Sequence, residues 1–166
     1  KQKTAYEIPK RDWSSDVCSS DLESPTPIDI ISSAQLLNTG TADVNDLLRE
    51  QIPSFNVQRL VSNDGAVFTR PFSLRNLPPD ETLVLVNGKR RHRGATVQFT
   101  NIPYIRGSQG PDLATIPSIA VGQLEVLRDG ASANYGSDAI AGVLNFRLRT
   151  DRSGGTLIAR YGQFYA

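Results

Sequence analysis

The densest group of chemically active side chains in this 166-residue sequence is the basic run Lys89-Arg90-Arg91-His92-Arg93. Arginine presents a planar fork of donors that binds carboxylates in a bidentate way, so the run indicates affinity for an anionic ligand. A solvated basic face on a turn is the other interpretation that these residues allow. Nucleic acid is disfavoured, because no aromatic residues interleave with the run and the formal net charge of the chain is only +1. His92 has no carboxylate or thiol at ligand spacing, so the sequence predicts no metal site.

Catalytic chemistry is not indicated elsewhere in the chain. Asp112, Asp129 and Asp138 are separated by predicted strands and loops, and no base or nucleophile accompanies them in a matching motif. Neither the phosphate-binding loop nor the dinucleotide-binding pattern of glycines occurs. The sequence therefore predicts a protein that is not an enzyme and that holds no cofactor.

Residues 1–22 are interpreted as foreign to the protein. Lys1–Ile8 is the translation of a common sequencing-library oligonucleotide, AAG CAG AAG ACG GCA TAC GAG AT, and Asp12–Leu22 continues the same oligonucleotide in the same frame. A natural Ser/Asp-rich tail is the alternative, and two matches in register argue against it. The only cysteine, Cys18, and the only tryptophan, Trp13, lie in this segment, so neither indicates a site.

The remaining sequence predicts short strands and helices joined by long loops. Strands are expected, from β-branched and alternating apolar patterns, over 28–31, 55–61, 72–75, 82–86, 124–127 and 143–148. Helices are expected from Ser32 or Ser33 to Leu37, and from a Thr41 cap to Ile52, ended by Pro53. No apolar run approaches the ~18 residues of a transmembrane helix.

Two local signals in this pattern are specific. Thr82–Val86 is so apolar that we expect it at the centre of a sheet, buried on both faces. Asn87-Gly88 follows at once and predicts a hairpin, because both residues tolerate positive φ. Near the C-terminus, Ser153-Gly154-Gly155 predicts a linker, and the alternating residues of 157–161 are typical of a barrel strand.

The signature that carries the most information lies in residues 116–145 and resembles the plug domain of TonB-dependent outer-membrane receptors. In chain order it holds Glu125-Val-Leu-Arg128, a small-residue loop, Tyr135-Gly136 and Gly142-Val-Leu-Asn145. It departs from the family pattern at two positions, where Asp129 is inserted and Ala141 replaces the first glycine of a pair. Further matches upstream occur in the expected order at Val44–Leu48, Leu74–Asn76 and Leu85–Gly88, so the resemblance spans nearly all of residues 27–150.

The resemblance implies an α+β fold, a small mixed β-sheet with short helices and long loops, followed by the start of a transmembrane β-barrel. The expected division is a non-native segment at 1–22, a plug domain at 23–152, and a linker with a first barrel strand at 153–166. The plug would fill the lumen of its own C-terminal barrel in the outer membrane of a Gram-negative bacterium. TonB would pull on a TonB box that would precede Glu23.

The resemblance also implies that a nutrient binds to apical plug loops. The expected ligand contacts are Arg75, Arg90, Arg91, His92, Arg93, Phe99, Tyr104, Arg106 and Gln109. Disorder of the long loop after residue 93 is the alternative. A ferric siderophore or related iron complex is the leading ligand, because a basic loop suits an anionic chelate. An oligosaccharide is the alternative within the family, and a soluble anion-binding α/β module is the alternative from another class.

Glu125 and Arg128 flank the end of one predicted strand. By resemblance they pair with charges on the barrel wall and act as a latch that holds the plug. A solvated surface pair, which would contribute little, is the other interpretation.

Overall fold

The structure is a computed structural model that describes residues 28–38, 43–59, 66–99, 102–103, 105–128, 134–151 and, singly, 153, 155, 157 and 159. The strands are β1 (Ile28–Ser32), β2 (Phe55–Val57), β3 (Phe72–Leu74), β4 (Thr82–Val86), β5 (Lys89–Arg90), β6 (Val121–Leu127) and β7 (Gly142–Leu148). The helices are α1 (Ser33–Asn38), α2 (Val44–Gln51) and α3 (Ala66–Thr69), with 3₁₀ turns η1 (Pro79–Glu81), η2 (Ser118–Ala120) and η3 (Ser137–Ala139). No helix in these ranges has the length and apolar character needed to cross a membrane.

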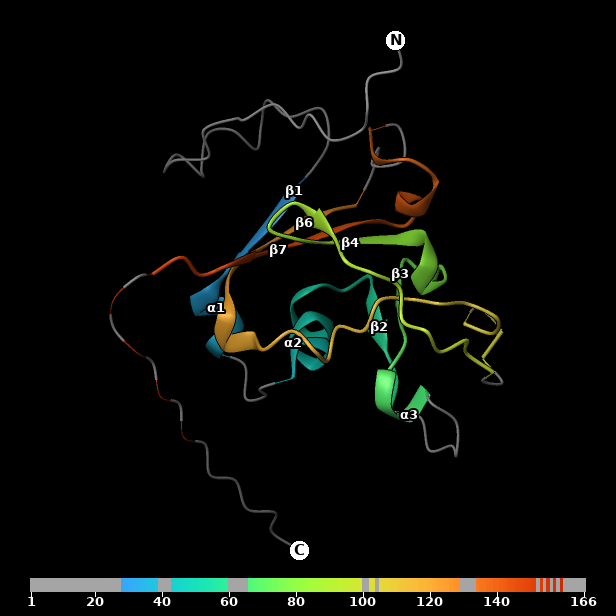
Figure 1. The fold of residues 1–166 in the computed structure, drawn as a ribbon, viewed down its shortest axis with the longest axis horizontal. Coiled ribbons are helices and arrows are strands. Elements are labelled where there is room, and N and C mark those ends of the chain that lie inside the picture. The colour runs from blue at the N-terminus through green and yellow to red at the C-terminus, as the bar shows by residue number, and fades with distance from the viewer. Residues whose placement is uncertain are drawn as a thin grey trace, which may run out of the picture.

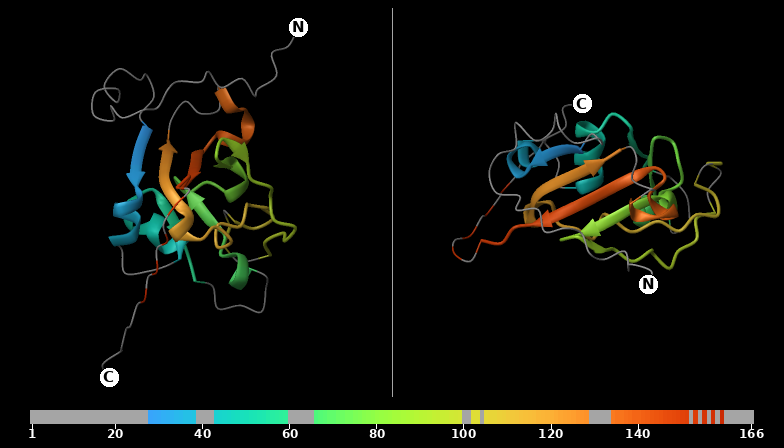
Figure 2. Two further views of the ribbon diagram at one scale, coloured as in Figure 1. Left: turned by 60° about the vertical axis from the view of Figure 1, so that its left-hand side comes forward. Right: turned by 90° about the horizontal axis from the view of Figure 1, so that it is seen from above.

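The strands build a mixed five-stranded sheet in the order β1-β6-β7-β4-β5, and β2 pairs with β3 in a separate antiparallel ribbon. Neighbours in the large sheet are antiparallel except β4 and β7, which run parallel with Leu83 opposite Val143. Figures 1 and 2 show β1, β6, β7 and β4 side by side, with the helices and the small ribbon on one side of them. The predicted α+β fold with a small mixed sheet is confirmed.

One expectation about the sheet needs correction. The prediction that β4 is buried on both faces is confirmed, since Thr82 to Leu85 are all buried. However, β4 is not the central strand, because its outer neighbour β5 has only two residues. The centre is β7, which pairs along its length with β6 and β4. A run of apolar residues indicates burial, but it does not tell which buried strand lies in the middle.

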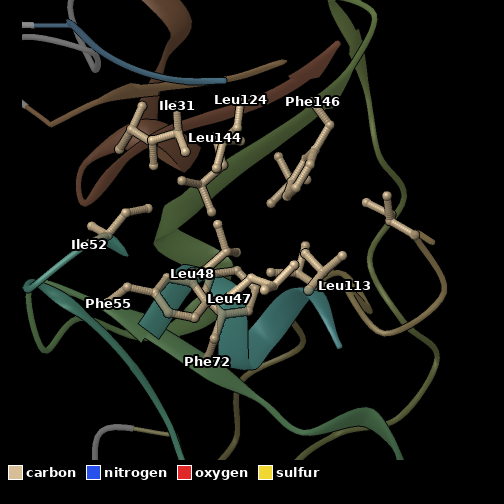
Figure 3. Close-up of a cluster of buried hydrophobic side chains, with 14 of the residues drawn as sticks. Ile31, Leu47, Leu48, Ile52, Phe55, Phe72, Leu113, Leu124, Leu144 and Phe146 are labelled. Atoms are coloured by element: carbon tan, nitrogen blue, oxygen red, sulfur yellow. The ribbon is translucent and has the colours of Figure 1, made fainter. Parts of the chain in front are cut away.

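The main core lies between the sheet and α2 (Figure 3). Leu47, Leu48 and Ile52 project from the helical side and are at most 1% exposed. They meet Leu144 and Phe146 from the sheet. Below them, the rings of Phe55 and Phe72 stack with centroids 5.2 Å apart and planes 15° from parallel. Each fully buried leucine contributes roughly 1.5–3 kcal/mol, so α2 is firmly anchored to the sheet.

The helix caps follow local chemistry, with one correction. Gln35 Oε1 accepts from the backbone N–H of Ser32 at 2.8 Å, while Ser32 Oγ accepts from the N–H of Gln35 at 3.4 Å. This reciprocal pair is a capping box and confirms Ser32 as the start signal of α1. The cap of α2 is Asp43 rather than Thr41, because the Asp43 carboxylate accepts from the N–H of Asn45 at 2.9 Å. Thr41 lies outside the described residues.

The predicted turns and strand ends are confirmed in part. Asn87 and Gly88 have φ of 51° and 75°, as the predicted hairpin between β4 and β5 requires. The strand expected over 55–61 ends at Val57, and Leu60 and Val61 lie outside the described residues. The strand expected over 72–75 ends at Leu74, because Arg75 turns the chain with φ of 56°. Of the barrel strand expected over 157–161, only 157 and 159 are described, so that expectation stays a prediction.

Candidate ligand-facing site

The basic run is fixed to the surface of its own domain by residues far along the chain. Arg90 and Arg93 both form ion pairs with Asp138 of η3, Arg93 at 3.2 Å. Arg91 donates to Thr115 Oγ1 at 2.8 Å. The hydrogen bond from Arg90 lowers the pKa of Asp138 below its ordinary value, against a weaker opposing effect of burial. The side chains of Arg90 and Arg93 nevertheless remain 47% and 50% exposed, so each keeps donors that face solvent.

A hollow of about 250 Å³ opens among these arginines. Its lining includes His92, Asp138 and Thr82. Thr82 is 3% exposed, and its hydroxyl has no hydrogen-bond partner among the described residues. Within the same described ranges, no three His, Cys, Asp or Glu side chains come together in a group that could hold a metal ion. Arginine forks around a small hollow suit a carboxylate or a similar anion, so the arrangement can bind anionic groups.

The segment 94–110, which we call the apical loop after its expected position in a receptor, is crossed by several backbone hydrogen bonds. Gln98 donates its N–H to Ser108 O at 3.1 Å and accepts from the N–H of Gly107 at 2.7 Å. The N–H of Gly94 donates to Gly110 O at 2.9 Å, which closes the base of the loop beside the basic run. The described residues on the two sides of the loop are therefore joined by backbone hydrogen bonds.

Two of the predicted ligand contacts on the apical loop, Phe99 and Arg106, lie toward solvent. Phe99 is 73% exposed, and Arg106 is exposed as well. Gln109 is partly buried and donates to Ala95 O at 3.5 Å. Tyr104 lies outside the described residues. Phe68 on α3 is a second exposed aromatic residue, at 82%, and sequence reasoning missed it because no local motif marks it.

Arg75 has a different setting from the other predicted contacts. Its guanidinium donates to Arg128 O at 2.8 Å, so the structure ties it to the end of β6. The basic run and the apical loop meet at Gly94, whereas this hydrogen bond places the guanidinium of Arg75 at the end of β6. Its role as a ligand contact stays a prediction.

The two residues predicted to latch the plug are paired inside the domain. Glu125, whose side chain is 13% exposed, forms an ion pair with Arg147 and accepts from Asn145 Nδ2 at 2.7 Å. Arg128 forms an ion pair with Asp29 of β1. Glu125 and Asn145 line an open groove of about 690 Å³ on the face of the sheet. The pairing with a barrel wall stays a prediction, and the structure shows that these side chains are already held in place before any such pairing.

A second charge cluster was not expected from the sequence. Asp46 of α2 accepts from Arg59 through Oδ2 and from Arg70 through Oδ1, both at 2.7 Å. Arg70 also pairs with Asp43. Burial works against ionisation of Asp46, but the hydrogen bonds and charges of Arg70 and Arg59 outweigh it and lower the pKa of Asp46.

Comparison with known proteins identifies the class of this domain. Residues 20–143 match the TonB-dependent Receptor Plug Domain family. The match covers most of the chain and includes β1 to β6, the basic run and the apical loop. The chain belongs to the TonB-dependent receptor plug family, as the signature around Glu125 and Gly142 predicted. This membership argues against the soluble anion-binding module.

Three individual proteins are similar to this chain. An iron-regulated outer membrane virulence protein of Vibrio cholerae serotype O1 is 34% identical over 128 residues, covering 77% of this chain and 18% of the relative. The siderophore receptor PirA of Acinetobacter baumannii is 27% identical with a TM-score of 0.55, covering 74% of this chain and 17% of that one. The ferric enterobactin receptor PfeA is 27% identical with a TM-score of 0.56, covering 76% and 18%. The chain thus spans about a fifth of the length of the relatives that it matches.

Proposed function

We propose that this chain is the gate, and part of the ligand site, of a TonB-dependent outer-membrane receptor that imports a ferric siderophore or a related iron complex. The observation that carries the proposal is the plug-family match over residues 20–143. The support for an iron complex as the ligand comes from relatives described as iron-regulated or as siderophore receptors. The protein is then a transporter component rather than an enzyme.

The physical role of such a domain follows from the shape of a large barrel. A wide barrel leaves an aqueous channel, so a folded domain inside the lumen is needed to close it. The partners of the chain would be its own barrel in the outer membrane of a Gram-negative bacterium and TonB, which would pull on a segment upstream of β1. The ligand would bind where the basic run and the apical loop face outward.

The charge of the basic run supports an anionic ligand. Arg90, Arg91 and Arg93 carry three positive charges, and Asp138 neutralises one of them. The exposed donors of Arg90 and Arg93 would meet the negative groups of an iron chelate. Because the guanidinium group of Arg91 is already oriented by Thr115, less side-chain entropy is lost when an anion binds to it.

An oligosaccharide receptor is the second candidate, and one observation favours it. Phe68 and Phe99 are exposed on neighbouring segments, which Gln98 joins by donating to Thr69 Oγ1 at 3.1 Å. Exposed aromatic faces suit the apolar faces of sugar rings as well as aromatic groups of a chelate. The basic run is the feature that favours the iron complex.

The test uses the full-length receptor and a triple variant, Arg90→Ala with Arg91→Ala and Arg93→Ala. A charge-assisted hydrogen bond contributes roughly 1.5–3 kcal/mol, so loss of one ligand contact weakens binding at least about tenfold. The measurements are equilibrium binding of a panel of ferric siderophores and of neutral oligosaccharides, with energised uptake of radioactive iron alongside. Arg49→Ala on exposed α2 surface is the control. Binding of oligosaccharides alone, with no ferric chelate bound by the wild type, would refute the iron proposal.

A further inference from the structure

We propose that Asp46 and Arg70 are positioning residues for the apical loop, and that they act through α3 rather than by contact with a ligand. The ligand-binding role of the loop rests on the proposed function, but the mechanical link does not. Each step of the link is a contact between described residues that lie far apart in the sequence.

The first step is that both oxygens of one carboxylate, that of Asp46, accept hydrogen bonds. The two oxygens of Asp46 each receive a different arginine at 2.7 Å, Arg59 on Oδ2 and Arg70 on Oδ1. Arg59 follows β2 and Arg70 follows α3, so Asp46 holds both ends of the chain segment that contains α3. The two ion pairs, which we call the Arg59 arm and the Arg70 arm, differ in solvent exposure, because the Arg59 side chain is 76% exposed and that of Arg70 only 12%. Arg70 is therefore the stronger arm.

The second step is the backbone of Arg70. Its φ is 43°, in the left-handed region that non-glycine residues seldom occupy. Such a conformation persists where surrounding contacts over-determine it. Here the contacts are the ion pairs of Arg70 with Asp43, the N-cap of α2, and with Asp46 in its first turn. Because Leu47 and Leu48 on the same helix are buried in the core, α2 is a rigid support for this arm.

The third step leads from α3 to the apical loop. Thr69, directly before Arg70, ends α3, and its hydroxyl accepts from Gln98 Nε2 at 3.1 Å. Gln98 is 3% exposed, and its backbone exchanges hydrogen bonds with Gly107 and Ser108 across the loop. A shift of Thr69 therefore moves both sides of the loop, including the exposed Phe99. Figure 1 shows α3 below β2 and next to the loop, farther from the large sheet than α2 is.

The test is amide hydrogen exchange, followed by mass spectrometry, on the full-length receptor without ligand. Asp46→Asn removes the charge with almost no change of shape, and Thr69→Val replaces the hydroxyl by a methyl group of similar size. Each variant is expected to speed exchange in residues 94–99 and 105–110 about tenfold, the loss of one charged or buried hydrogen bond. Since the contacts act in series, the double variant should be no faster than either single variant.

Two controls separate positioning from general stability. Arg59→Gln breaks only the exposed arm, so exchange in the apical loop should stay as in the wild type. Residues 44–51 and 121–127 report on α2 and β6, and their exchange should not change in Thr69→Val. If Asp46→Asn speeds exchange in α2 and leaves the apical loop unchanged, Asp46 only stabilises its own helix and the proposal is overturned.

A further outcome also decides the matter. If Asp46→Asn fails to fold in the receptor, Thr69→Val still tests the last link, and unchanged exchange in the apical loop of that variant overturns the proposal. Additive effects in the double variant would show two independent contacts and would overturn it as well. No ligand is present in these measurements, so their result does not depend on whether the receptor binds an iron complex.

Discussion

Gly142 is a position where a single added methyl group should strongly destabilise this domain. It begins β7 with φ of 144°, where residues with a side chain are strained. A Cβ at this position would lie 2.6 Å from Leu127 O and 2.9 Å from Leu74 Cδ2. The leucine methyl can move, but Leu127 O belongs to the paired strand β6, where Leu127 lies opposite Val143. The strands must therefore separate at this end to accommodate alanine.

The size of the effect follows from these two penalties. An unfavourable φ costs about 1–2 kcal/mol, and opening the end of the β6–β7 ladder removes one or two hydrogen bonds of about 0.5–1.5 kcal/mol each. With the displaced packing of Leu74, the free energy of local opening should fall by roughly 3–4 kcal/mol. Gly136→Ala is a matched control, because its φ is 90° but nothing lies within 4 Å of its Cβ position. It should show the backbone penalty alone, about 1–2 kcal/mol.

The assay is native-state amide exchange of the β6 and β7 peptides in the full-length receptor, with the opening free energy taken from the exchange rates. Gly142→Ala should accelerate exchange at Val126, Leu127 and Val143 far more than Gly136→Ala does. Equal effects of the two substitutions would refute the reasoning, because the close approach to Leu127 O would then contribute nothing.

Two further predictions follow from the same contacts. Asn87→Ala should destabilise the β4–β5 hairpin by about 1–3 kcal/mol. The variant loses a residue that tolerates φ of 51°, and it loses the hydrogen bond that Asn87 Oδ1 accepts from the N–H of Leu148 at 2.9 Å. Amide exchange at residues 84–91 measures the effect, and an unchanged exchange rate would contradict the prediction. The lowered pKa of Asp46 means that its ionised form is stabilised in the folded state. Its contribution to the free energy of unfolding is therefore fully present above the unfolded-state pKa of about 3.9, and it is lost as the pH falls through the lower folded-state pKa. Urea unfolding of the 166-residue chain between pH 5 and 3 should therefore show a smaller acid-induced loss in Asp46→Asn than in the wild type, and equal losses would contradict this.

The features that could be predicted from the sequence are those that a few neighbouring residues determine. Asn87-Gly88 specifies its hairpin because both residues accept positive φ, and the Ser32 cap needs only a glutamine three residues later. The signature from Glu125 to Asn145 gave the family because it fills one continuous segment. The prediction of Thr41 as the cap of α2 was wrong, because Asp43 is equally suited to cap a helix. The contact that distinguishes Asp43, its ion pair with Arg70, joins residues 27 positions apart, and no pattern of neighbouring residues indicates it.

The charge pairs of the site could not be predicted, because they join residues that only the fold brings together. Asp138 lies 48 residues beyond Arg90, and Arg70 lies 24 residues beyond Asp46. Opposite charges occur throughout the sequence, so type alone does not select a partner. The basic run was therefore expected to be free for a ligand, whereas the structure shows two of its arginines shared with a carboxylate.

That sharing has a consequence for how the proposed receptor would bind an anion. A ligand that takes donors from Arg90 and Arg93 competes with Asp138, which lies on η3 just after the signature residues Tyr135-Gly136. If the ligand weakens these ion pairs, η3 loses its tie to Arg90 of β5, while the hydrogen bond from the N–H of Ala141, two residues after η3, to Glu81 O at 2.9 Å remains. Ligand binding and the position of η3 are then linked, and by reciprocity a force that displaces η3 changes the affinity of the basic run. Asp138→Asn should thus raise affinity for an anionic ligand by removing the competitor, while Asp112→Asn, whose carboxylate lies at a turn and accepts from the N–H of Ala114 at 2.9 Å, should not.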